Sequence, residues 1–267
     1  MRLATWNVNS VTARQPRLIA WLAEVQPDVL ALQETKVPAD GFPAAAVEAL
    51  GYQVVAHGDG RWNGVALLSR VGLTDVRRGL PGDPGYPDGA TLEPRAVSAT
   101  CGGVRVWSVY VPNGREPGHA HYAYKLQWLA ALRDALAVEP QPLVVMGDFN
   151  VAPTDADVWD PPAFAQSTHV TPAERNALAG IRALGLADVL PRALKYDTPY
   201  TYWDYRAGMF PKNMGMRIDL VYASSALADR VTDAYVDRDA RKGKGPSDHA
   251  PVVVDVALLE VAPEETT

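Results

Sequence analysis

The sequence lacks the marks of a secreted, membrane-spanning or disulfide-stabilised protein. Its 267 residues include a single cysteine, Cys101, so no internal disulfide can form and nothing in the chain requires an oxidising compartment. No apolar stretch has the length of a signal peptide or reaches the roughly 18 residues that cross a membrane. We therefore expect a cytoplasmic protein without a membrane partner.

Positive charge is also scarce. The chain has 25 Lys and Arg against 31 Asp and Glu, a net charge of −6, so a polyanionic partner would need a local basic face or a metal ion to hold it. Hydrophobic residues make up 48% of the chain, and seven Trp and eleven Tyr argue against disorder. The 21 Gly and 22 Pro favour many turns and short connections over long helical rods. These numbers predict a folded globular protein.

Apolar runs of strand length recur along the whole chain, at residues 3–6, 29–32, 65–68, 104–111, 143–146, 218–222 and 252–256. Helices are predicted at residues 18–25 behind Pro16, at 122–136, and from the capping box that starts at Thr171 to a stop at Gly185. Because strand and helix alternate only in places, the pattern favours two mixed sheets with outer helices over a purely parallel sheet. No repeat or linker divides the chain. We therefore expect one domain over residues 1–257 and a short polar tail at 258–267.

Polar residues stand at the ends of these apolar runs. Any one of them is readily explained as a turn or capping residue. Strands of a sandwich end along a common edge, however, and clustered carboxylates repel each other unless a cation joins them. An oxygen-rich set suits Mg²⁺ or Mn²⁺ rather than zinc, so the pattern predicts a Mg²⁺-dependent hydrolase of phosphate esters. The residues concerned are Asn7, Glu34, Asp148, Asn150, Asp219, Asp248 and His249.

Six ordered motifs carry a family resemblance: Trp-Asn-Val-Asn-Ser at 6–10, Leu-Gln-Glu-Thr-Lys at 32–36, Tyr-Val-Pro-Asn-Gly at 110–114, Gly-Asp-Phe-Asn at 147–150, Arg-Ile-Asp-Leu at 217–220 and Ser-Asp-His-Ala-Pro at 247–251. Over residues 3–256 the chain resembles exonuclease III type AP endonucleases, members of the endonuclease/exonuclease/phosphatase superfamily. The resemblance implies an α/β fold, a four-layer sandwich of two mixed β-sheets packed face to face with helices on the outer faces. It also implies an active site at one edge of the sandwich.

The resemblance further implies roles for single residues. Glu34 is the expected principal ligand of one or two Mg²⁺ ions, with Mn²⁺ as an alternative, and the further expected ligands are Asn7, Asp148, Asn150, Asp248 and His249. Asp148 would orient and deprotonate the attacking water, and Asn150 would hold that water or a phosphate oxygen. His249 would contact the scissile phosphate, Asp219 would fix its tautomer or keep it protonated, and Tyr110 would contact the phosphate or leaving group.

Structural alternatives exist for three of these side chains. Glu34 has the alternative of a salt bridge with Lys36, which lies two positions away on the same strand face. His249 has the alternative of a satisfied core residue, and Tyr110 that of a core aromatic with its hydroxyl at the rim.

On the substrate side, the resemblance implies that Asn113 and Arg115 bind phosphate. It also implies a pocket for a flipped-out abasic sugar, with Tyr202, Met216 and Ile218 as its walls and Trp203 in the same segment. The basic run that contains Arg241 and Lys242 precedes the Ser-Asp-His motif directly, which favours a DNA contact over a merely solvated loop.

The function expected from these motifs is a Mg²⁺-dependent DNA-repair phosphodiesterase. It would cleave 5′ to abasic sites and act as a 3′–5′ exonuclease or 3′-repair enzyme, as a monomer on double-stranded DNA with abasic sites or 3′ ends. The alternatives are a superfamily relative that acts mainly as a 3′–5′ exonuclease or on another phosphoester, and an inert DNA-binding module on the same fold.

Overall fold

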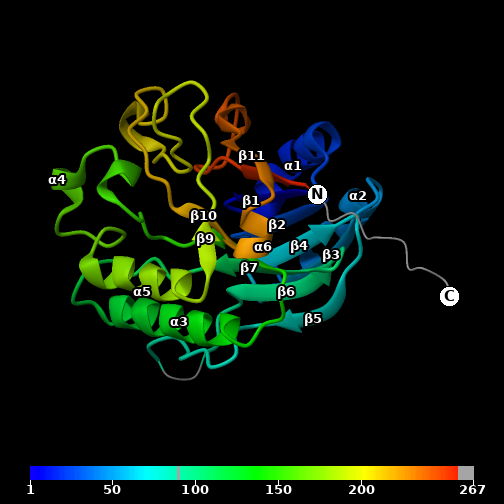
Figure 1. Ribbon diagram of the computed structural model, residues 1–267. Helices are drawn as coiled ribbons and strands as arrows, with labels where there is room; N and C mark the ends of the chain where they lie inside the picture. Colours follow the sequence, from blue (N-terminus) through cyan, green and yellow to red (C-terminus); the bar gives the residue numbers. More distant parts are fainter. Residues whose placement is uncertain (89–90, 258–267) are drawn as a thin grey trace.

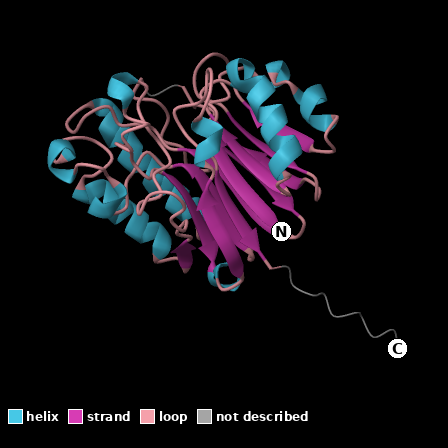
Figure 2. Cartoon of the chain, turned by 90° about the horizontal axis from the view of Figure 1, so that it is seen from above, coloured by secondary structure: helices cyan, strands magenta, loops and turns pink. Residues whose placement is uncertain are grey.

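The fold is a sandwich of two sheets with helices on both outer faces (Figure 1). The computed structural model describes residues 1–88 and 91–257; the expected tail at 258–267 lies outside the described residues. Viewed from above, the two sheets lie side by side and helices flank them on either side (Figure 2). This arrangement confirms the predicted four-layer α/β architecture.

The first sheet has the strand order β11-β12-β1-β2-β4-β3, in which only β1 and β2 pair in parallel. On its outer face α1 (Val11–Val25) and α2 (Ala44–Glu48) cover a core that includes Trp6, Leu22 and Leu30. The strands are β1 (Arg2–Asn7), β2 (Val29–Gln33), β3 (Gln53–His57), β4 (Val65–Ser69), β11 (Val231–Val236) and β12 (Val252–Val256).

The second sheet has the order β5-β6-β7-β8-β10-β9, with β7 and β8 parallel. Two helices, α3 (Ala120–Leu136) and α5 (Pro172–Arg182), pack on its outer face around Trp107 and Trp128. The strands are β5 (Thr74–Arg78), β6 (Ala96–Cys101), β7 (Val104–Tyr110), β8 (Leu143–Asp148), β9 (Leu186–Asp188) and β10 (Asp219–Ser224). Shorter helical turns are α4 (Pro161–Phe164), α6 (Ser225–Ala228), η1 (Ala39–Gly41), η2 (Asp155–Asp157), η3 (Arg206–Gly208) and η4 (Arg238–Arg241).

Alternation along the strands builds the core between the sheets. In β8, Val144 and Met146 face the other sheet, while Leu143 and Val145 face the helices. Each central strand is therefore apolar on both faces, which explains why the sequence shows continuous apolar runs. The seven predicted strands are present.

Helix ends follow local side-chain chemistry. Thr171 and Glu174 form the predicted capping box at the start of α5, but the helix ends at Arg182, short of the predicted stop at Gly185. The Ser10 side chain accepts a hydrogen bond from the Ala13 amide and starts α1 earlier than the apolar spacing alone predicts.

Chain direction brings strand ends to one edge. The parallel strands β1 and β2 finish there with Asn7 and the residue before Glu34, and the parallel strands β7 and β8 finish there with Tyr110 and Asp148. Strand β10 runs antiparallel to β8 and begins at the same edge with Asp219. Polar ends of both sheets therefore lie along one rim. None of the helices in the described residues is long and apolar enough to cross a membrane.

Candidate active site

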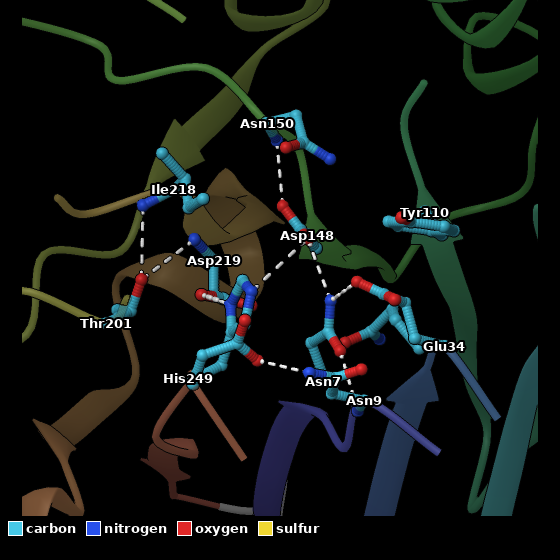
Figure 3. Close-up of polar contacts among 12 residues, drawn as sticks. Asn7, Asn9, Glu34, Tyr110, Asp148, Asn150, Thr201, Ile218, Asp219 and His249 are labelled. Atoms are coloured by element: carbon cyan, nitrogen blue, oxygen red, sulfur yellow. Dashed lines mark hydrogen bonds and ion pairs between the residues drawn. The ribbon is translucent and has the colours of Figure 1, made fainter. Parts of the chain in front are cut away.

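Side chains from both sheets converge at this rim (Figure 3). Glu34 from the first sheet, Asp148 from the second and His249 from the segment before β12 each offer one ligand atom, and these atoms lie within 4.8 Å of one another. The structure thus brings together the predicted strand-end residues, although they are far apart in the sequence.

Asn7 joins the two carboxylates. Its buried Nδ2 donates to Glu34 Oε1 at 2.8 Å and to Asp148 Oδ2 at 2.9 Å, while its Oδ1 accepts from the Asn9 amide at 3.0 Å. In this arrangement Asn7 fixes the carboxylates with its amino group. The predicted role as a metal ligand would use its oxygen, which here is bound to Asn9.

Asp148 is buried at the end of β8, and its second oxygen accepts from the Asn150 amide at 2.9 Å. Burial raises its pKa to about 7; the charges of Asp219 and Glu34 act in the same direction, and that of His249 opposes them. A carboxylate with a pKa near neutrality is suited to accept a proton at physiological pH. The crowding of negative charge that contributes to this pKa is also what a bound cation would relieve.

His249 forms a pair with Asp219. Its Nδ1 lies 2.8 Å from Asp219 Oδ2, and its Nε2 lies 3.8 Å from Asp148 Oδ2. Burial lowers the pKa of the imidazole, but the charge of Asp219 and the hydrogen bond to it, together with the charges of Asp148 and Asp248, raise this pKa to about 10. At neutral pH His249 is therefore a cation that points towards the rim. A protonated imidazole has no free lone pair, so this state does not suit its predicted role as a metal ligand.

The salt bridge considered for Glu34 is present. Lys36 Nζ lies 2.7 Å from Glu34 Oε2 and donates to Asn9 Oδ1 at 2.6 Å. Burial raises the pKa of Glu34, but the charge and hydrogen bond of Lys36 outweigh it and lower that pKa overall. Asp248 lies beside this group and accepts from Asn9 Nδ2 at 3.0 Å. It faces the cavity but stands outside the three-atom cluster.

A cavity of about 460 Å³ opens from the rim. Glu34, Asp148 and His249 lie in its lining, and the predicted walls Tyr202 and Met216 form part of the remainder. The other predicted residues that line it are Tyr110, Asn113, Arg115, Asn150, Ile218 and Asp248. Trp159, Phe164 and His169 also line it, and sequence reasoning did not identify these three.

His169 is the most unusual of these. It adopts φ +84°, a conformation that non-glycine residues rarely use and that often marks functional sites. Its Nδ1 lies 2.7 Å from the Thr168 carbonyl oxygen, and its Nε2 lies 3.2 Å from Asn113 Nδ2 and 3.3 Å from Asn150 Oδ1. Burial and the charge of Lys125 lower its pKa to about 3. The neutral ring therefore donates from Nδ1 to Thr168 and accepts from Asn113 at Nε2.

A buried ion pair supports the loops behind the cavity. Lys125, on the inner face of α3, pairs with Glu174 and also donates to the carbonyl oxygens of Asn113 at 3.1 Å and Asn150 at 2.7 Å. Glu174 in turn accepts from the His169 amide at 2.9 Å. One pair thus holds three cavity-lining segments. The only sequence signal for it is a lysine among the apolar residues of a helix.

Two predicted DNA contacts require correction. Trp203 is fully buried in the core between the sheets, and its indole N–H donates to Asn213 Oδ1 at 3.3 Å. Arg241 is also buried and donates to the Trp203 carbonyl oxygen at 3.0 Å. Both side chains face the protein interior, so they support the fold rather than line the cavity. Lys242, by contrast, is exposed.

Tyr110 is both a core aromatic residue and a member of the site, as the two hypotheses for its sequence position allowed. Its side chain packs against the core between the sheets, and its hydroxyl forms a hydrogen bond with Glu34 at the rim. Burial and the charge of Glu34 hold its pKa well above the usual value, so the phenol keeps its proton. The Arg95 guanidinium lies 4.8 Å from the centre of its ring.

Known proteins share this architecture. The model of the endonuclease/exonuclease/phosphatase family matches residues 4–249. The chain belongs to this family. Exodeoxyribonuclease III of Haemophilus influenzae is 32% identical over 94% of this chain and 98% of its own length. Among solved structures, the 3′ phosphatase NExo from Neisseria, bound to a product DNA hairpin, is 39% identical with a TM-score of 0.91 over 97% of this chain and all of that chain.

An AP endonuclease from Archaeoglobus fulgidus is 37% identical with a TM-score of 0.90, again over 97% of this chain and all of that one. These similarities confirm the predicted family, fold and enzyme class. This member of the endonuclease/exonuclease/phosphatase family is a phosphodiester hydrolase of the exonuclease III type.

Proposed function

We propose that this chain is a metal-dependent DNA-repair nuclease that cleaves duplex DNA 5′ to abasic sites and removes nucleotides or blocking groups from 3′ ends. The observation that carries the proposal is the convergence of Glu34, Asp148 and His249 at the mouth of one cavity with a partly apolar wall. A phosphodiester needs the charged side chains, and its sugar needs the apolar wall, so the two must lie next to each other.

The polar half of the cavity fits phosphodiester hydrolysis. Asp148 accepts the proton of the attacking water, because its carboxylate has a pKa near 7 and both of its oxygens are held by hydrogen bonds. The His249 cation contacts the non-bridging phosphate oxygen, on which negative charge grows in the transition state. Asn150 and Asn113 offer amide groups to the same phosphate from the adjacent loops.

The donor set fits a hard divalent cation. Glu34 already binds one positive charge, the Lys36 ammonium, and Asp148 and Asp248 bring further carboxylates close to it. We propose that Glu34, Asp248 and Asp148 hold Mg²⁺ or Mn²⁺, since both ions prefer carboxylate oxygens. When bound, such an ion neutralises charge on the phosphate and helps the leaving oxygen depart.

The apolar half of the cavity supports binding of a sugar without its base. Tyr202, Met216 and Ile218 form a wall without cationic groups, and Trp159 and Phe164 extend it. An apolar wall next to the phosphate-binding groups suits the carbon skeleton of an extruded sugar, and a missing base makes extrusion easier, which favours abasic sites and terminal groups.

One observation favours a second candidate, an enzyme that acts on 3′ ends and does not incise abasic sites. The imidazole of His169 stands inside the cavity against Asn113 and Asn150, where it reduces the space next to the phosphate-binding groups. The Neisseria relative, described as a 3′ phosphatase, is a precedent for such activity in this fold.

A matched set of substrates tests the proposal. Three duplexes would be incubated with Mg²⁺ or with EDTA: one with a central abasic analogue, one with a nick bearing a 3′ phosphate, and one undamaged and blunt. Metal-dependent internal cleavage of the first supports the leading proposal, whereas 3′ processing alone supports the second candidate. Asp148→Asn should abolish every activity. Asp233→Asn changes a partly exposed carboxylate on β11 that pairs with Arg192 outside the cavity lining, and it should change no activity. Full activity of Asp148→Asn would refute the assigned role.

We also propose that the protein is a monomer and that it acts in the cytoplasm on the DNA of its own cell. A lone buried cysteine and a cavity completed by residues of one chain support this assignment. Size-exclusion chromatography with light scattering would measure the mass in solution.

A further inference from the structure

The loop between β11 and β12 is closed around one guanidinium. Arg17 of α1 donates to the carbonyl oxygens of Ala240 at 3.3 Å and Lys242 at 2.8 Å, and twice to that of Lys244, at 3.0 and 2.8 Å. Figure 1 shows this orange to red segment beside α1. Because a guanidinium presents its donors in a rigid plane, it fixes the path of all three carbonyl groups.

Glycine makes this close approach possible. Gly243 adopts φ +84°, and a Cβ atom at this position would lie 3.0 Å from Arg17 Nη2. Any side chain here would be strained and would push the guanidinium away. The loop sequence Lys-Gly-Lys-Gly therefore suits both the turn and the position of Arg17.

The lysines of the loop face solvent. Residues 242–245 are all exposed, while their carbonyl groups at 242 and 244 are bound to Arg17. Within the part of the chain that the structure describes, Lys242 pairs only with Asp239 of the same loop, and both side chains of this pair are more than half exposed, so the pair is weak. Among the described residues, no acceptor is bonded to the Lys244 ammonium. Two cations are thus presented to the surroundings with few internal partners.

The loop leads directly into the cavity. The Pro246 carbonyl oxygen accepts from Arg14 Nη2 at 3.2 Å and from the Tyr205 hydroxyl at 2.9 Å, which anchors the end of the loop. Asp248, which faces the cavity, follows Lys244 by four residues. An extended chain of that length spans at most about 14 Å, which corresponds to roughly four nucleotides along one DNA strand.

We propose that this loop binds the phosphate backbone of duplex DNA next to the cleaved bond, and that Arg17 is the positioning residue that presents Lys242 and Lys244 to it. The inference rests on the proposed function in so far as DNA is the substrate. In a simple basic patch every cation would contact phosphate. Here the Arg17 guanidinium binds the carbonyl groups of the loop and sets its shape, and only the two lysines contact phosphates.

Binding of an undamaged duplex in EDTA, measured by fluorescence anisotropy from 50 to 200 mM salt, tests this without any cleavage. Each phosphate contact adds about 0.9 to the slope of log affinity against log salt concentration. Lys242→Met with Lys244→Met should therefore lower the slope by about two, so that the wild type loses roughly tenfold more affinity over this range. The matched control, Arg70→Met with Arg133→Met, removes two exposed charges elsewhere and should leave the slope unchanged.

Arg17→Lys separates position from charge. This substitution keeps the net charge, but a lysine cannot bridge three carbonyl groups. The salt dependence of DNA binding by this variant should therefore be as weak as that of the double lysine variant. Adding Arg17→Lys to that variant should cause no further loss, because the two changes act through the same contacts. At saturating short substrate, kcat should stay at the wild-type value while KM for long duplexes rises.

A double lysine variant with the wild-type slope would overturn the DNA contact. An Arg17→Lys variant that binds like the wild type would overturn the positioning role. If instead the wild type fails to cleave any damaged duplex with Mg²⁺, the proposed function fails, and the binding slopes remain a separate result.

Discussion

The proton on His249 depends on Asp219, and this dependence can be measured. Replacing Asp219 with Asn keeps the size of the side chain but removes its charge. In the wild type, burial lowers the pKa of His249, and the charge of Asp219 and its 2.8 Å hydrogen bond lead the group of effects that raise it to about 10. Without them the desolvation remains, opposed only by the charges of Asp148 and Asp248, so the pKa should fall towards the ordinary value of about 6.5.

The size of the effect follows from that fall. His249 acts as a cation, so activity is present below its pKa and is lost as pH rises through it. With a pKa of about 6.5, only about 3% of the molecules carry the proton at pH 8, and the rate should drop about 30-fold at that pH. The wild type, with a pKa of about 10, should lose nothing on the alkaline side until pH approaches 10.

The assay is the pH profile of kcat/KM on a damaged duplex at saturating Mg²⁺, from pH 5.5 to 10. The wild-type acid limb belongs to Asp148, whose pKa is about 7 before a cation lowers it, so the alkaline limb is the informative one. Asp219→Asn should narrow the profile from the alkaline side, and Asp233→Asn should leave it unchanged. Alkaline limbs of Asp219→Asn and the wild type that coincide at the same pH would refute the reasoning.

Three further predictions follow from contacts around the cavity. Lys125→Met leaves the Glu174 carboxylate buried without its cation, so the free energy of unfolding in urea should fall by about 3–5 kcal/mol, and adding Glu174→Gln should restore part of it. A loss below about 1 kcal/mol would contradict this. Because the pKa of Glu174 is lowered, the stabilisation that the ion pair gives to the wild-type fold is fully present above pH 4.5. It is lost as the pH falls through the lowered pKa of Glu174. Lys36→Met removes the ammonium bound to Glu34 and should tighten Mg²⁺ binding up to about fivefold by calorimetry; unchanged affinity would show that Lys36 does not compete with the ion. His169→Gly relieves the φ of +84° and widens the cavity, so it should raise abasic incision relative to 3′-phosphate removal by roughly tenfold without lowering the melting temperature. An unchanged ratio would exclude His169 as a determinant of substrate choice.

Most of the inner strands and helix α5 were predictable because short patterns of neighbouring residues determine them. Most of the inner strands contain a continuous apolar run, and helix α5 begins at a capping box, so their positions follow from sequence alone; the inner strand β6 is an exception because Ser98 and Thr100 interrupt it. Strands β3, β5, β6, β9 and β11 were not predicted. In β5 (Thr74–Arg78) every residue is exposed, so no alternation of apolar and polar residues marks it. Its strand conformation depends on pairing with β6, a tertiary effect.

The candidate site was predictable to the extent that it lies on strand ends. The residues that sequence reasoning misplaced or missed depend on loop geometry. Tyr202 pairs with Met216 and with His249 in an extended conformation, so its neighbour Trp203 must face the opposite side, into the core. His169 reaches the cavity only because the loop before α5 takes a positive φ, and no pattern in the sequence announces that turn.

The carboxylates of the site belong to different sheets: Glu34 extends from the first and Asp148 from the second. The distance between them is therefore set by how closely the two sheets pack, that is, by residues such as Val29, Val144 and Val106 deep in the interior. Repacking that interior can shift a reacting group by an ångström without touching substrate, and such a shift costs about a hundredfold in rate. The catalytic rate of this molecule should therefore respond strongly to the volume of the side chains between the two sheets. Conservative substitutions there should lower the rate before they lower the stability of the fold.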